Sequence, residues 1–230
     1  DDHRRGKVMK GMLIKDFRIL KYQGKTLFLM LLVVAVLMNL ITDVGPTFIV
    51  GYITIIFSLF TVTTVSYDEF DNCYLFLMTL PVTRKKYVNE KYLFALLSII
   101  FAWCAGIVLG IILMIVQPSG EVDAADWFGT CLGYIFTAWI FVSVMLPLRL
   151  KFDAEKARYA NLIMIAAVAI AAFLISNALE YVPAKIVGPG KEWFSGLGTG
   201  GILGLFAVVT ALVVVISYLC SQHIMAKKEF

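Results

Sequence analysis

Six hydrophobic segments, each close to the length of a membrane-crossing helix, constrain the fold of this 230-residue chain more than any other feature. A helix needs about 20 apolar residues to cross the hydrocarbon of a bilayer. Charged residues make up only 16% of the chain, whereas they make up about a quarter of a soluble domain. The sequence therefore predicts an all-α integral membrane protein with a six-helix transmembrane domain over 25–220. The predicted spans are 25–42, 47–65, 92–116, 127–148, 159–179 and 200–220.

The basic residues lie almost entirely on one side of the predicted bundle. The connections before the first span, between the second and third, between the fourth and fifth, and after the sixth hold 18 of the 20 Lys and Arg residues when Lys25, the first residue of the first span, is counted with them. Connections rich in Lys and Arg stay in the cytoplasm. We therefore expect cytoplasmic N and C termini, with a cytoplasmic tail over 221–230 and a cytoplasmic segment over 66–91.

The residues before the first span form two parts. Residues 1–8 carry no pattern and are interpreted as an added or disordered start. Over 9–24, apolar residues recur on one side of a helix while most basic residues lie elsewhere, which predicts an amphipathic elbow helix in the headgroup plane. The apolar stripe consists of Met9, Met12, Leu13, Phe17 and Leu20.

The segment over 66–91 is the long charged interruption in the first half of the chain. Ser66 followed by Glu69 has the spacing of a capping box, and acidic residues cluster beside them, which predicts that a short helix begins here. Pro81 ends that helix because it lacks a backbone donor. Thr83 is expected to cap a second helix that begins at the basic residues and continues into the next span.

The predicted short helix is apolar around much of its circumference, so something must cover it. It either lies on the bilayer surface without a partner or docks in a groove of another protein. The residues of this segment alone favour neither alternative.

The spans hold little that indicates chemistry. Ionisable residues inside a membrane are costly and usually functional, and the predicted spans are almost free of them, so the chain is not expected to be an enzyme. The four cysteines are scattered, without the spacing of a metal site, and the sequence over 188–191 lacks the spacing of a phosphate loop. The mildly polar span residues suit an amphipathic or lipophilic cargo, although such side chains more often bond their own helix. The candidate path residues are Thr61, Asn161 and Asn177.

Residues 80–88 read LPVTRKKYV, and Lys91-Tyr92-Leu93 follows. Together with the elbow helix, six spans and cytoplasmic ends, this string resembles the permease subunit of ABC-2 type transporters, in which an LPVSRKEYVxxKYL-like string follows the helix that contacts the ATPase. Thr83 replaces the usual Ser and keeps the hydroxyl group. The size and loop pattern resemble small permeases of bacterial exporters for antimicrobial or amphipathic peptides, including the phenol-soluble modulin exporters.

The resemblance implies an ABC-2 exporter-like fold and a cytoplasmic coupling helix that contacts a separate ATPase. It implies no cofactor on this chain, with ATP and Mg on the partner ATPase. The residues expected to contact the ATPase are Asp68, Glu69, Phe70, Asp71, Tyr74, Leu75, Phe76, Leu77, Met78 and Leu80. The motif after them consists of Leu80, Pro81, Thr83, Arg84, Lys85 and Lys86.

The same resemblance implies the partners and the location of the protein. Two ATPase copies and a second permease, identical or paralogous, would complete an exporter in the bacterial plasma membrane. The cargo would be an amphipathic peptide or drug, moved by alternating access, and no nucleic acid is involved. The alternative function is that of a non-transporting membrane sensor or assembly protein with an interfacial helix over 70–80.

Overall fold

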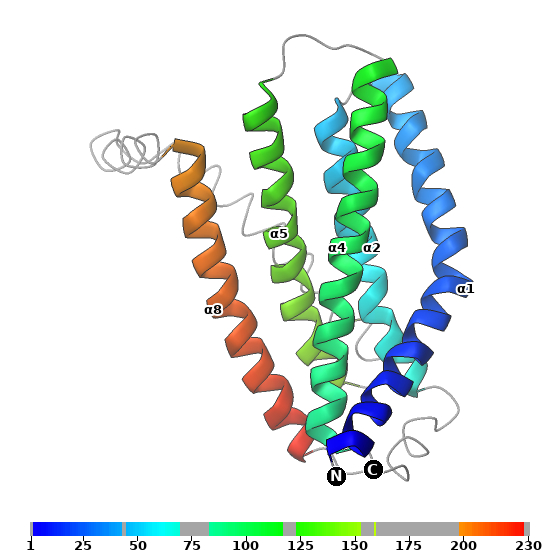
Figure 1. Ribbon diagram of the computed structural model, residues 1–230, viewed down its shortest axis with the longest axis vertical. Helices are drawn as coiled ribbons and strands as arrows, with labels where there is room; N and C mark the ends of the chain where they lie inside the picture. Colours follow the sequence, from blue (N-terminus) through cyan, green and yellow to red (C-terminus); the bar gives the residue numbers. More distant parts are fainter. Residues whose placement is uncertain are drawn as a thin grey trace.

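The computed structural model describes residues 2–42, 45–69, 83–116, 123–152, 159 and 198–227. Within these ranges the chain forms five long helices that lie lengthwise beside one another (Figure 1). Each is long and apolar enough to cross a membrane. The predicted fifth span, apart from Tyr159, and residues 70–82 lie outside the described part of the chain. The helices are α1 (Asp2–Thr42), α2 (Pro46–Glu69), α4 (Arg84–Val116), α5 (Ala124–Lys151) and α8 (Gly198–Lys227).

Helices α2 and α4 pack closely together and form the centre of the described bundle. Val50 and Ile53 of α2 and Phe94 of α4 are fully buried. Gly106 of α4 lets the two backbones approach, because a Cβ atom there would lie 3.2 Å from the Cα atom of Val50. Small residues at such contacts are a common means of packing helices in a membrane.

Helices α5 and α8 pack against each other and run in the same direction. At one end, Thr199 donates a hydrogen bond to Asp126 over 3.1 Å. Nearer the other end, Ser217 donates to the backbone oxygen of Ser143. The start of α5 is capped by Asp123, whose side chain accepts a hydrogen bond from the backbone N–H of Ala125 over 3.0 Å.

The N-terminal region differs from the predicted elbow helix. Helix α1 runs without interruption from Asp2 to Thr42, so the elbow over 9–24 and the span over 25–42 are one helix. Residues 9–42 contain no proline that would interrupt the helix, although its path bends partway along its length (Figure 1). The helix also includes most of the residues over 1–8 that were expected to be a disordered start. Its beginning and the end of α8 lie at the same end of the bundle (Figure 1).

The capping-box prediction at Ser66 is also corrected. Helix α2 continues through Ser66 to Glu69, so these residues end a long helix instead of beginning a short one. The spacing of Ser66 and Glu69 fits a helix start, but Asp68 pairs with Lys15 of α1 and with the buried Lys91 of α4, which hold the last turn of α2 in place. Tertiary contacts thus outweigh the local pattern.

Candidate functional site

A network of five ionisable side chains joins α1, α2 and α4 near the end of the bundle where α1 begins and α8 ends. We call this set the charge network; apart from Lys15, which is 31% exposed, each of its side chains is at most 2% exposed. Buried ionisable residues in a membrane protein are candidates for function by default. The network consists of Lys15 and Asp16 of α1, Asp68 of α2, and Glu90 and Lys91 of α4.

Lys91 lies at the centre of the charge network. Its ammonium group pairs with Asp16 on α1 and lies 2.8 Å from Asp68 Oδ2 on α2. It also lies 3.8 Å from Glu90 Oε2 and 5.3 Å from the centre of the Tyr87 ring, within the range of a cation–π contact. One side chain of α4 therefore contacts both neighbouring helices.

Asp68 connects the end of α2 to the other two helices. One of its oxygens pairs with the ammonium group of Lys15. The other accepts a hydrogen bond from the Tyr87 hydroxyl over 2.8 Å, in addition to its contact with Lys91. Charge-assisted hydrogen bonds of this kind are about twice as strong as neutral ones, so the last turn of α2 is held tightly.

The charge network has three carboxyl groups for two ammonium groups. Asp16 Oδ1 and Glu90 Oε1 are buried and have no hydrogen bond within the described residues, although Asp16 Oδ1 lies 3.4 Å from the Lys15 ammonium nitrogen. A buried charge is costly unless it is paired, and removal of one partner costs about 3–5 kcal/mol. The arrangement is therefore sensitive to any movement that separates its members.

The pKa of Asp68 reflects this balance. Burial alone raises the pKa of this carboxyl group, but the ammonium groups of Lys91 and Lys15 outweigh burial and hold the pKa below its ordinary value of 3.8. The carboxylate is consequently charged at neutral pH and fully available for pairing.

The first turns of α4 also contact α8. The hydroxyl group of Tyr92 shares hydrogen bonds with Ser217 over 2.6 Å and with Ser221 over 2.9 Å. The Tyr218 hydroxyl donates to the side-chain oxygen of Asn89 over 2.6 Å. Lys91 and Tyr92 are adjacent in sequence, so neighbouring residues of α4 link α8 on one side with α1 and α2 on the other.

Arg84 joins the start of α4 to the end of α8. Its guanidinium group donates to the backbone oxygen of Ala226 over 2.7 Å and to that of Met225 over 3.4 Å. These carbonyl groups lie in the last turn of α8, where the helix dipole favours a cation. The predicted cap at Thr83 is confirmed, because α4 begins at Arg84 and the Lys86 backbone N–H donates to the Thr83 hydroxyl over 3.4 Å.

The predicted site residues are distributed unevenly over the described part of the chain. Asp68 is buried near the end of α2, although it was expected near the start of a short helix that contacts the ATPase, and Glu69 is the last residue of α2. Lys85 and Lys86 lie in the first turn of α4. Thr61 is buried and donates a hydrogen bond to the backbone oxygen of Phe57 over 3.2 Å, so its role in a cargo path stays a prediction. Phe70, Asp71, Tyr74, Leu75, Phe76, Leu77, Met78, Leu80, Pro81, Asn161 and Asn177 lie outside the described residues.

The charge network itself was not predicted, but α1 carries a signal for it. Asp16 lies four residues after Met12 and four before Leu20, so it occupies the apolar stripe of the helix. Both of these apolar neighbours are buried. An acidic residue within an apolar stripe predicts a buried cationic partner, which the structure identifies as Lys91.

Comparison with known proteins gives one match. The family model described as ABC-2 family transporter protein matches residues 11–226. No curated protein and no solved structure matches the chain significantly.

Proposed function

Because the chain belongs to the ABC-2 transporter family, we propose that it is the permease subunit of an ATP-driven exporter and forms half of its translocation path. Membership of this family makes the chain a membrane component that works with an ABC ATPase. In the proposed complex, two ATPase subunits and a second permease, identical or paralogous, complete an exporter in the bacterial plasma membrane. Both termini and residues 66–91 face the cytoplasm.

The observation that carries the proposal is the anchoring of both ends of residues 70–82. On the preceding side, Asp68 is bonded to side chains of α1 and α4. On the following side, Arg84 is bonded to the end of α8. A force applied to the residues between these anchors therefore reaches four of the described helices directly. This is the arrangement that a segment driven by an ATPase requires.

We infer that residues 70–80 include the coupling helix and that the charge network transmits its movement. Asp68 would act through Lys91 and Lys15, because its carboxylate is buried and therefore not placed for direct contact with a partner. The ATPase cycle would tilt α1, α2, α4 and α8 between inward-facing and outward-facing states, each as a rigid element. Closure of the ATPase dimer supplies the free energy that biases the two states.

The direction of the helices supports a sixth span. Helices α5 and α8 run in the same direction, since Asp126 contacts Thr199 near their starts and Ser143 contacts Ser217 farther along. The connection between such helices has to return from one end of the bundle to the other. The predicted span over 159–179 falls within that connection.

The proposed cargo is an amphipathic peptide or a lipophilic compound. A cavity of about 330 Å³ between α5 and α8 supports this class, because hydroxyl groups and aromatic rings line it together. Thr130 and Thr137 present hydroxyl groups there, and Tyr134 and Phe206 present rings. An amphipathic molecule has matching polar and apolar parts.

Co-expression with a candidate ABC ATPase from the same genome, followed by purification in mild detergent and mass determination, tests the proposal. We expect a complex of two permease chains and two ATPase chains. Leu77→Asp should abolish co-purification, whereas Tyr22→Asp, at a side chain that is 86% exposed on α1, should not. Asp68→Asn should keep the ATPase bound but reduce ATP-dependent transport in vesicles.

Two results would overturn the proposal. A chain that purifies alone, with no ATPase held under mild conditions, would favour a membrane sensor or assembly protein. If Asp68→Asn released the ATPase as completely as Leu77→Asp does, Asp68 would contact the partner directly, and the charge network would not be the transmitting element.

A further inference from the structure

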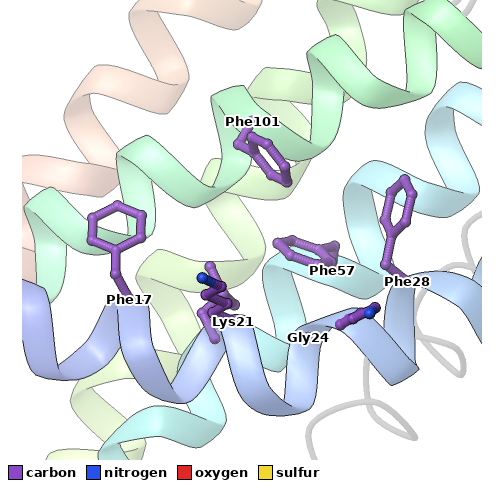
Figure 2. A pocket seen from close by; sticks show the side chains of 8 residues that line it. Phe17, Lys21, Gly24, Phe28, Phe57 and Phe101 are labelled. Atoms are coloured by element: carbon purple, nitrogen blue, oxygen red, sulfur yellow. The ribbon is translucent and has the colours of Figure 1, made fainter.

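An aromatic groove opens between α1, α2 and α4, close to the charge network. Figure 2 shows the side chains that line this cavity. Its volume of about 370 Å³ is within the range of small-molecule sites. Phe57 of α2 forms its floor and is only 2% exposed. The ring of Phe57 lies 6.4 Å from that of Phe28 and 6.1 Å from that of Phe101, measured between ring centres. Three helices thus build one continuous apolar surface.

Two lysines stand beside this apolar surface. Phe17, Gly24 and Phe28 lie on one face of α1, because their spacings of seven and four residues correspond to about two turns and one turn of a helix. Lys21 and Lys25 of α1 line the same cavity. Their side chains are exposed. Among the described residues, no carboxylate is paired with either of them.

We propose that this groove binds an anionic phospholipid, with an acyl chain on the aromatic rings and the phosphate group at Lys21 and Lys25. The ammonium groups of the two lysines favour an anionic headgroup, since each lysine near an anionic membrane surface increases binding by about fivefold. The aromatic rings favour the acyl chain of the lipid, since apolar area removed from water stabilises binding.

The depth of the groove in the membrane fits this occupant. Lys25 is the last basic residue of α1 before an apolar run that begins at Leu27. The lysines therefore lie where headgroups meet acyl chains, and the groove extends toward the hydrocarbon. A zwitterionic lipid would bring its own cation close to the two ammonium groups and so supply no net counter-charge. An apolar face of another protein would desolvate them at a cost.

Gly24 provides a way to close the groove. A Cβ atom at Gly24 would lie 3.4 Å from Leu20 Cγ and 3.9 Å from Phe57 Cε2, which are ordinary contact distances. A methyl group therefore fits, while a larger side chain fills the cavity. Gly24→Leu and Gly24→Ala form a matched pair for testing the groove.

Native mass spectrometry of the full chain in detergent, titrated with dioleoyl phosphatidylglycerol or dioleoyl phosphatidylcholine, tests the proposal. We expect tighter binding of phosphatidylglycerol and a loss of roughly 30-fold in its affinity when Lys21→Gln and Lys25→Gln are combined. Lys151→Gln combined with Lys227→Gln removes the same charge from α5 and α8 and should leave the affinity unchanged. Gly24→Leu should abolish specific binding, whereas Gly24→Ala should retain it.

Several results would overturn the proposal. Equal binding of the two lipids, or equal losses in the two double-lysine variants, would exclude recognition by Lys21 and Lys25. If inorganic phosphate displaced the lipid completely, the aromatic rings would not contribute to lipid binding. The groove would be a cargo site if phosphatidylglycerol did not bind there while an anionic amphipathic peptide did, and if Gly24→Leu abolished the binding of that peptide. If Gly24→Leu fails to fold, the lysine variants decide the outcome alone.

Discussion

Replacement of Lys91 by methionine is the most direct perturbation of the charge network. Lys91→Met keeps an unbranched apolar side chain of similar length but removes the ammonium group that contacts Asp16, Asp68 and Glu90. Lys15 then remains as the single cation of the network for three buried carboxyl groups. Removal of one partner from a buried ion pair costs about 3–5 kcal/mol, and we expect a loss of stability in that range.

Thermal unfolding of the purified chain in detergent measures this loss. For a chain of this size, 1 kcal/mol corresponds to about 2–4 °C, so Lys91→Met should lower the melting temperature by roughly 6–20 °C. Lys85→Met removes the same charge from an exposed position of the same helix and should change it by less than about 2 °C.

A double-mutant cycle separates pairing from packing. Asp16→Asn combined with Lys91→Met should cost less than the sum of the two single variants by about 0.5–3 kcal/mol, because the unpaired charge on Asp16 is gone. Similar melting temperatures for Lys91→Met and Lys85→Met would refute the reasoning. Strict additivity in the cycle would also refute it.

Three further predictions concern other contacts in the bundle. Tyr92→Phe should destabilise the chain by about 1–3 kcal/mol in the same melting assay, since it leaves buried serine hydroxyls of α8 with fewer partners; an unchanged melting temperature would contradict this. Gly51→Ala should cost about 1–3 kcal/mol, because its Cβ atom would lie 2.5 Å from the Tyr134 ring, whereas Gly133→Ala, which meets no atom within 4 Å, should not destabilise. A larger loss of stability for Gly133→Ala than for Gly51→Ala would contradict close packing of Gly51 against Tyr134. The lowered pKa of Asp68 contributes stability that is present above its unfolded pKa of about 4 and is lost as pH falls through the lower folded pKa. The difference in free energy of unfolding between the wild type and Asp68→Asn should therefore become smaller below pH 4. A difference that stays constant with pH would contradict the pairing.

The positions of five of the predicted spans, those that lie in the described helices, could be predicted from the sequence because hydropathy reports burial in lipid directly. The helices extend beyond the predicted spans where charged residues begin. Helix α4 starts at Arg84, eight residues before the predicted start of the span at residue 92. A hydropathy count treats Glu90 and Lys91 as the end of a span, whereas the helix continues because these side chains find partners inside the protein.

The charge network could not be predicted because its partners are far apart in the sequence. Lys91 and Asp16 are separated by 75 residues, and Lys15 and Asp68 by 53. A local pattern such as Asp16 in the apolar stripe of its helix indicates that a partner exists, but it contains no information about which distant residue that partner is. The capping-box spacing at Ser66 was misleading for the same reason, since it reports a preference of neighbouring residues only. By contrast, the cap at Thr83 involves the next three residues and was predicted correctly.

The continuity of α1 has a mechanical consequence. At about 1.5 Å per residue, its 41 residues extend for about 62 Å, roughly twice the thickness of the hydrocarbon layer. The Asp16–Lys91 pair holds this helix near one end, and about 39 Å of helix length separates that point, taken as a fulcrum, from Thr42. The helix bends along its length (Figure 1), and Leu31 and Ala35 beyond Asp16 are packed against α2. A tilt of about 10° around that fulcrum displaces the far end by about 7 Å over an arm of this length. In the proposed transport cycle, a tilt of α1 together with α2, which packs on it, would convert a displacement of an ångström or two beside the fulcrum into a displacement several times larger on the opposite side of the membrane.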